Sequence, residues 1–122
     1  MEESTMIKAF VKRLPELQGF HGEGVTFLDE HEAETISSNY VRLKTGQSTP
    51  EGCHDDEEEV YVITGGKARL ILGDATHEVG AGDVVYIPRD VVHQATCISA
   101  EDFEYICVAN WPDRLPKLTA HS

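Results

Sequence analysis

The residues best suited to bind a metal or move protons are concentrated in one short segment, GCHDDEEEVYVITGG, residues 52–66. His54 is followed by five consecutive acidic residues, then by an apolar run and a pair of glycines. Imidazole and carboxylate groups are good ligands for divalent metals. The same acids also suit a solvated turn, so the strand that follows has to indicate which of them point inward.

The orientation of these acids can be inferred from strand periodicity. Residues two apart in an extended strand share a face, so Glu58 lies on the same side as Val60 and Val62. His54 falls on this side by the same count. A buried imidazole and carboxylate need a compensating partner, which a divalent metal would supply. If the two valines point inward, the parity makes His54 and Glu58 candidate metal ligands, with ordinary surface positions as the alternative. It places the acids of the other face in solvent: Asp55, Glu57 and Glu59.

A second histidine has an equivalent place in GDVVYIPRDVVHQATC, residues 82–97. His93 follows the turn that begins at Pro88, and Ala95 and Cys97 share its face by the same count. Each of the two apolar strands therefore carries a histidine at its edge. The hairpin between the strands can bring these histidines together, so the two segments predict one shared site.

The elements that position this site are expected to be short strands separated by turns. The apolar segments are rich in β-branched and aromatic residues, with glycine, aspartate or proline between them. The pair Gly73-Asp74 between two apolar runs is typical of a tight hairpin. Strands are expected within residues 38–46, 59–66, 67–79, 79–98 and 103–112, a pattern that indicates a β-sandwich or a closed barrel.

The N-terminal region has a different pattern. In residues 7–14, IKAFVKRL, the apolar residues have helical spacing until Pro15 ends it. A short helix is expected there, with an N-terminal strand as the alternative.

Length and composition limit the function further. The 122 residues suffice for one domain with its own core, and no repeat or linker divides them. A formal charge of −12 disfavours binding to nucleic acid or to anionic membranes. The acidic N-terminus does not read as a signal peptide, and three cysteines without CxxC spacing suit a reducing compartment. We therefore expect a cytoplasmic protein that binds neither nucleic acid nor membranes.

Together the two segments resemble the two motifs of the cupin family, G(x)5HxH(x)3–4E(x)6G and G(x)5PxG(x)2H(x)3N. The positions that agree are Gly46, His54, Glu58 and Gly65 in the first motif, and Gly82, Pro88 and His93 in the second. The resemblance covers roughly residues 40–110. It implies an all-β, double-stranded β-helix (jelly-roll) barrel, with residues 1–122 forming a single cupin domain and at most one short N-terminal helix.

Three positions depart from the family pattern. Gly52 stands where the first motif usually has its first metal-binding histidine. Asp90 replaces the glycine of the second motif, and Cys97 replaces its final asparagine. The change at Gly52 matters most, because the usual site of the family has three histidines and one glutamate. It leaves a vacant ligand position beside His54.

The resemblance implies His54, Glu58 and His93 as the metal ligands. Two histidines and one carboxylate are a known ligand set for ferrous iron, and zinc, nickel or manganese would also be compatible with them. An alternative alignment pairs Glu59 with Gly66 and also satisfies the motif. Glu58 is preferred because it has the parity of His54, and because the residues up to Gly65 fit the end of the family's strand better.

The substrate pocket has four further candidates: Gly52, Asp56, His77 and Cys97. His77 either lines the pocket or lies exposed on its hairpin. The resemblance favours a metal-dependent enzyme that acts on a small oxygenated molecule, as an isomerase, a lyase or cyclase, or a dioxygenase. A non-catalytic cupin that binds or senses a small ligand is the alternative. The family also implies a homodimer, to which residues 1–20 would contribute an arm.

Overall fold

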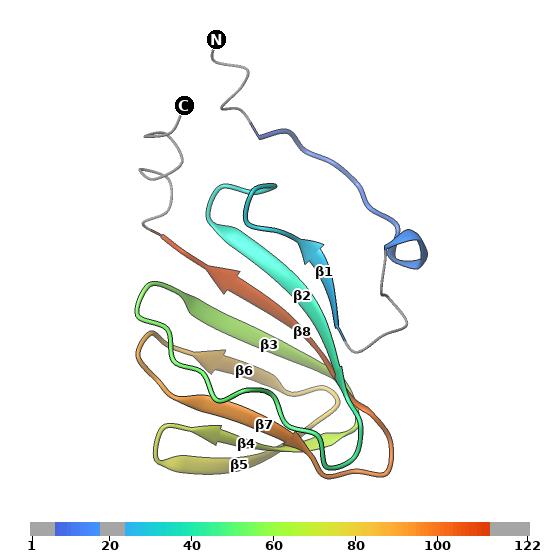
Figure 1. Ribbon diagram of the computed structural model, residues 1–122, viewed down its shortest axis with the longest axis vertical. Helices are drawn as coiled ribbons and strands as arrows, with labels where there is room; N and C mark the ends of the chain where they lie inside the picture. The colour runs from blue at the N-terminus through green and yellow to red at the C-terminus, as the bar shows by residue number, and fades with distance from the viewer. Residues whose placement is uncertain (1–6, 18–23, 113–122) are drawn as a thin grey trace.

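The computed structural model describes residues 7–17 and 24–112, which form two antiparallel β-sheets (Figure 1). The larger sheet has the strand order β1-β2-β8-β3-β6, and the smaller sheet has the order β5-β4-β7. This arrangement confirms the predicted all-β jelly-roll fold. The strands are β1 (Gly24–Leu28), β2 (Ile36–Leu43), β3 (Glu58–Gly65), β4 (Lys67–Leu72), β5 (Ala75–Gly80), β6 (Val84–Ile87), β7 (His93–Cys97) and β8 (Phe103–Asn110).

Two glycines determine how the chain turns between and within the sheets. Gly66 carries the chain from β3 to β4 with a φ of +70°, and an added Cβ would lie 2.3 Å from the carbonyl oxygen of Asp102. A larger residue would force the backbone apart, so glycine is required there. Gly73 has a φ of +59° in the predicted hairpin, which places Leu72 opposite Ala75.

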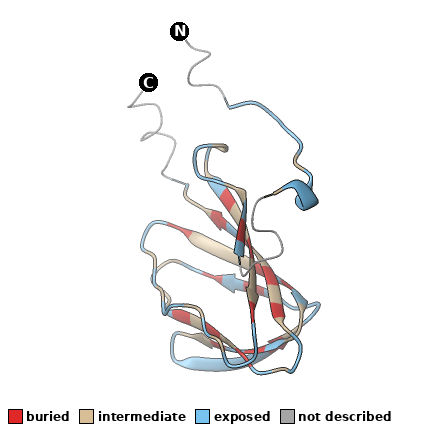
Figure 2. Cartoon of the chain, turned by 45° about the vertical axis from the view of Figure 1, so that its right-hand side comes forward, coloured by how far each residue is buried: buried red, intermediate tan, exposed pale blue. Residues whose placement is uncertain are grey.

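The hydrophobic core lies between the two sheets and takes buried residues from β2 to β8, alternate ones in β3, β4, β6, β7 and β8 (Figure 2). In β3 the buried residues are Tyr61 and Ile63, whereas Val62 is 39% exposed. The prediction that Val60 and Val62 point inward is therefore wrong. Both faces of this strand are apolar, so hydrophobicity alone could not identify the inner one. The most deeply buried side chains are Phe103, Ile63, Leu70, Ile87 and Cys97.

The expected helix over residues 7–14 is not present in the described residues. The structure has a 3₁₀ helix at Leu14–Glu16, and the apolar side chains before it are largely exposed, Val11 by 76%. Because an isolated helix of eight residues is unstable without packing, the helical spacing alone does not produce one. Strand β1, which pairs with β2, was not predicted from the sequence. Within residues 7–17 and 24–112, no helix is long and apolar enough to cross a membrane.

The loop between β2 and β3 pairs with β7, and this pairing brings the two predicted metal-binding segments together. Its residues 46–52 run antiparallel to β7 and exchange backbone hydrogen bonds with it (Figure 1). At the end of this segment, the N–H of Gly52 donates to the carbonyl of His93 at 3.0 Å, and the N–H of His93 donates to the carbonyl of Gly52 at 2.9 Å. The segments thus meet through this pairing, and not through the hairpin expected from the sequence.

Candidate metal centre

Three side chains converge near the start of β3 and the start of β7. They are His54, from the loop before β3, Glu59, from the second position of β3, and His93, from the start of β7. One potential ligand atom of each lies within 4.8 Å of the other two. The structure therefore brings together both predicted histidines, but with Glu59 as their carboxylate.

One oxygen of Glu59 lacks the partner that a buried carboxylate needs. Oε1 is fully buried and accepts no hydrogen bond from the described residues. It lies 3.2 Å from Nε2 of His93 and 4.0 Å from Nε2 of His54. The Nδ1 atom of His93 lies 3.0 Å from the carbonyl of Val91, which can only accept, so Nδ1 carries a hydrogen and Nε2 of the neutral ring has a lone pair. A proton or a metal ion between these atoms would remove the electrostatic conflict.

The pKa values of this pair shift in the directions that an ion pair produces. Burial alone would raise the pKa of Glu59, but the nearby His93 ring, the thiol of Cys107 and the charges of both histidines lower it below its usual value. The neighbouring carboxylate of Glu59 raises the pKa of His93, against the effect of burial. The carboxylate is therefore ionised at neutral pH and available to a cation.

Glu58 lies on the opposite face of β3, so the prediction that it points inward is wrong. Its carboxylate accepts hydrogen bonds from the hydroxyl of Tyr86 at 2.7 Å and from Nδ2 of Asn110 at 3.2 Å. These bonds lower the pKa of Glu58. The parity count failed because the chain bends at Asp55 and Asp56 and becomes extended only at Glu58. The alternation of faces along β3 therefore does not extend back to His54.

Glu57 was assigned to solvent, but it is 9% exposed. Its Oε1 lies 3.2 Å from Nδ1 of His54. Burial raises the pKa of Glu57, and the neighbouring His54 partly offsets this effect. The thiol of Cys107, on the inner face of β8, donates to Oε2 of Glu59 at 3.2 Å, and burial raises its pKa. Neither residue was identified as part of a site from the sequence.

Gly52 faces directly into the group of ligand atoms. An added Cβ would lie 3.5 Å from Nε2 of His93 and 3.8 Å from Nε2 of His54, which are ordinary contact distances. Gly52 is not among the glycines with positive φ. A Cβ at this position would therefore contact both imidazoles, which places Gly52 beside them; that it leaves a vacant ligand position stays a prediction.

Asp90, which stands where the second motif has glycine, adopts a backbone conformation that usually favours glycine. It is the one described non-glycine residue with positive φ, at +67°. Aspartate enters this left-handed region more readily than most residues, so it can stand where the motif has glycine. Its backbone N–H donates to the carbonyl of His54 at 2.7 Å, which ties the turn before His93 to the loop of His54.

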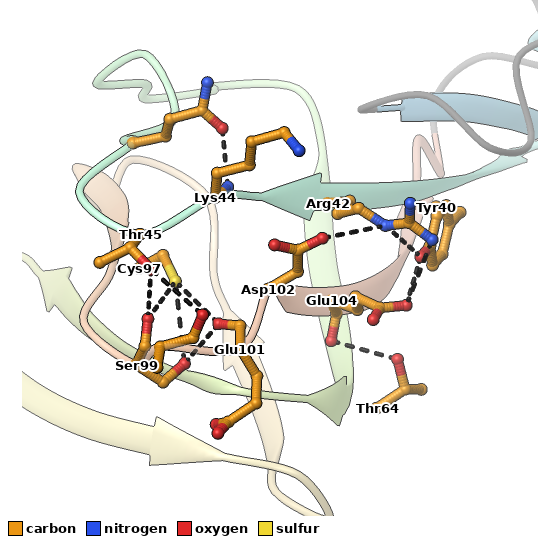
Figure 3. A network of polar contacts seen from close by, with 12 residues as sticks. Tyr40, Arg42, Lys44, Thr45, Thr64, Cys97, Ser99, Glu101, Asp102 and Glu104 are labelled. Carbon is orange, nitrogen blue, oxygen red and sulfur yellow. Dashed lines mark hydrogen bonds and ion pairs between the residues drawn. The ribbon is translucent and has the colours of Figure 1, made fainter.

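The other three pocket candidates lie apart from this centre. Asp56 is exposed in the bend before β3, and His77 is exposed on the edge strand β5. Cys97 is on the inner face of β7, as predicted, but at the opposite end from His93. Its thiol contacts the carbonyls of Ser99 and Glu101 at 3.6 and 3.5 Å (Figure 3).

Comparisons with known proteins agree with this architecture. Residues 39–109 match the sequence model of the Cupin domain family. An uncharacterized protein of Streptomyces coelicolor is 32% identical over 111 residues, which are 88% of this chain and 99% of that protein. A cupin 2 conserved barrel domain protein of Salinispora arenicola aligns with a TM-score of 0.69 and 20% identity, over 96% of this chain and 99% of that chain. A predicted oxalate decarboxylase of Thermotoga maritima aligns with a TM-score of 0.68 and 20% identity, over 72% of this chain and 78% of that chain.

Proposed function

The chain belongs to the cupin domain family, and we propose that it is a metal-binding cupin that acts as an enzyme on a small oxygenated molecule. His54, Glu59 and His93 would hold the metal. In this proposal Glu59 replaces the Glu58 expected from the sequence, and it corresponds to the alternative alignment of the motif with Gly66.

The observation that carries the proposal is the buried Oε1 atom of Glu59. An ionised oxygen without a hydrogen-bond donor costs free energy unless a cation neutralises it. The two Nε2 atoms nearest to it have lone pairs when their Nδ1 atoms carry the hydrogens. Two imidazoles and one carboxylate form a donor set that accommodates iron, zinc, nickel or manganese.

The space beside Gly52 supports a catalytic role over a purely structural one. Structural zinc sites are closed by four protein ligands, whereas catalytic metal sites keep a position open for water or substrate. Here the missing side chain lies on the side of both Nε2 atoms. A hydroxyl or carbonyl oxygen of a substrate could enter there.

A bound divalent cation would supply Lewis-acid polarisation of such an oxygen. The protein would contribute orientation and exclusion of water. Glu59 and His93 are largely buried, with side chains 12% and 8% exposed, while His54, at 39%, is on the open side. Substrate would therefore approach past His54 and Gly52.

Metal analysis of the protein purified without added metal tests this proposal. We expect about one divalent metal per chain, and loss of that metal in Glu59→Gln, because a neutral amide is a poorer ligand than a carboxylate. Glu58→Gln is the matched control and should keep the metal. Metal lost in Glu58→Gln but kept in Glu59→Gln would refute this ligand set.

The alternative, a cupin that binds or senses a small ligand without turnover, requires a second measurement. The metal-loaded protein can be screened against small hydroxy and oxo compounds, with both thermal shift and product formation recorded. Oxalate belongs in this set because of the predicted oxalate decarboxylase among the similar structures. If compounds raise the Tm but none of them is converted to a product, the sensing role is favoured.

A further inference from the structure

Each of the three proposed ligands is held by a second contact on the side away from the centre. The carboxylate of Glu57 lies 3.2 Å from Nδ1 of His54. The carbonyl of Val91 lies 3.0 Å from Nδ1 of His93. The thiol of Cys107 donates to Oε2 of Glu59 at 3.2 Å. The atoms left free by these contacts are the ones that converge: two Nε2 atoms and Oε1.

The contact between Glu57 and His54 determines which ring nitrogen is available. A carboxylate accepts, so it holds the hydrogen of the neutral imidazole on Nδ1 and leaves the lone pair on Nε2. His54 needs this more than His93 does, because its side chain is 39% exposed and lies in a loop. Without Glu57, the described contacts of His54 would leave its tautomer unset.

The contact between Cys107 and Glu59 determines which carboxylate oxygen is available. The thiol occupies Oε2 and leaves Oε1 facing the histidines. Cys107 lies on β8 directly opposite Tyr61 of β3, so its position is fixed by the pairing of two central strands. The thiol therefore favours the orientation in which Oε1 faces the histidines.

We propose that Glu57 and Cys107 are positioning residues of the metal centre: Glu57 sets the tautomer of His54, and Cys107 sets the orientation of the Glu59 carboxylate. This inference rests on the proposed function. It adds two residues that do not bind the metal themselves. Such outer contacts typically change metal affinity by about 10- to 100-fold when they are lost.

The experiment uses the full chain and paired substitutions at each position. Glu57→Ala removes the acceptor and Glu57→Gln keeps one, while Cys107→Ala removes the donor and Cys107→Ser keeps one. Asp56→Ala, next in sequence but exposed, and Cys97→Ala, at the far end of the barrel, are the matched controls. The readouts are the Kd for manganese or zinc from chelator competition, and the tautomer of His54 from ¹⁵N NMR of the metal-free protein.

We expect Glu57→Ala and Cys107→Ala to weaken metal binding by about 10- to 100-fold, and the Gln and Ser variants to recover most of the affinity. Glu57→Ala should also shift the NMR signals of His54 away from the Nδ1–H tautomer. Folded Ala variants with the affinity of the parent, or an unchanged His54 tautomer, would overturn the proposal. A parent protein that binds no metal would refute the proposed function instead, and the tautomer of metal-free Glu57→Ala would still decide the role of Glu57.

Discussion

The two faces of strand β3 place neighbouring glutamates in opposite environments. On the outer face, Glu58 accepts two hydrogen bonds near solvent from Tyr86 and Asn110. On the inner face, Glu59 is buried, and one of its oxygens accepts no hydrogen bond from the described residues. The same side chain, displaced by one residue, changes from a surface acceptor to a candidate metal ligand. The comparison shows that the face, and not the residue type, determines the chemistry.

The difference between the two faces of β3 should have its largest effect on the free energy of unfolding. Ile63 is 2% exposed on the inner face, whereas Val62 is 39% exposed on the outer face. Ile63→Ala should reduce the free energy of unfolding by about 2–5 kcal/mol, because it leaves a cavity in the core. Val62→Ala should cost much less. Urea denaturation of both variants measures this, and similar losses would mean that the two faces of β3 do not differ as described.

Adding a histidine at Gly52, beside the candidate ligands, should strengthen metal binding on the inner side of the barrel. Gly52→His would restore the full ligand set of the family motif, and an added Cβ at this position would make only ordinary contacts. We expect metal affinity to rise by about tenfold, or about 1.4 kcal/mol. The same change should hinder any substrate that enters beside Gly52. Chelator competition measures the affinity, and a folded variant that loses metal as easily as the parent would contradict the vacant-position interpretation.

The smallest expected effect is the pH dependence of the metal-free protein. The pKa of His93 is raised above 6.5 in the folded state, so its contribution to stability is complete below that value and is lost as the pH rises through the folded pKa. The pKa of Glu59 is lowered below 4.5, so its contribution is present above that value and is lost as the pH falls through the folded pKa. The Tm should therefore decrease as the pH rises above about 6.5.

Thermal scans of metal-free variants isolate this effect. His93→Gln should flatten the decrease in Tm, whereas His31→Gln, at an exposed histidine, should not. The raised pKa of Glu57 also lowers stability as the pH rises, but starting from 4.5, so Glu57→Gln separates the contribution of that carboxyl group. A parent protein whose Tm rises over this range would contradict the ion pair between Glu59 and His93.

The fold was largely predictable because turn residues and apolar strands determine the order of the elements. The hairpin at Gly73-Asp74 and strands β3 to β8 lie where the pattern indicated them. The orientation of β3 was not predictable from hydrophobicity, since the outer face of the larger sheet also carries apolar residues, including Val62, Val84 and Val108. The missing N-terminal helix has a related cause, because its apolar side chains are partly or largely exposed and are not part of the core.

The residues of the candidate site were predictable where the spacing of the motif specifies them. Residues whose contacts depend on the packing of the folded barrel were not. His54 and His93 were identified from their positions at the edges of two apolar strands. Glu59 could be recognised from the alternative spacing to Gly66, but the bend before β3 misled the parity count. Glu57 and Cys107 acquire their contacts only from the folded barrel, and no motif position distinguishes them.

The pairing between residues 46–52 and β7 has a consequence for the rate of folding. Thr49 and Gln94, which it joins, are 45 positions apart in the sequence, and Glu59 and Cys107 are 48 apart. Contacts this distant form late, because the entropy of closing long loops is lost before they can be made. The candidate metal ligands are therefore gathered only when the barrel is nearly closed. We expect a metal to slow unfolding with little effect on the folding rate, since it stabilises contacts absent from the transition state.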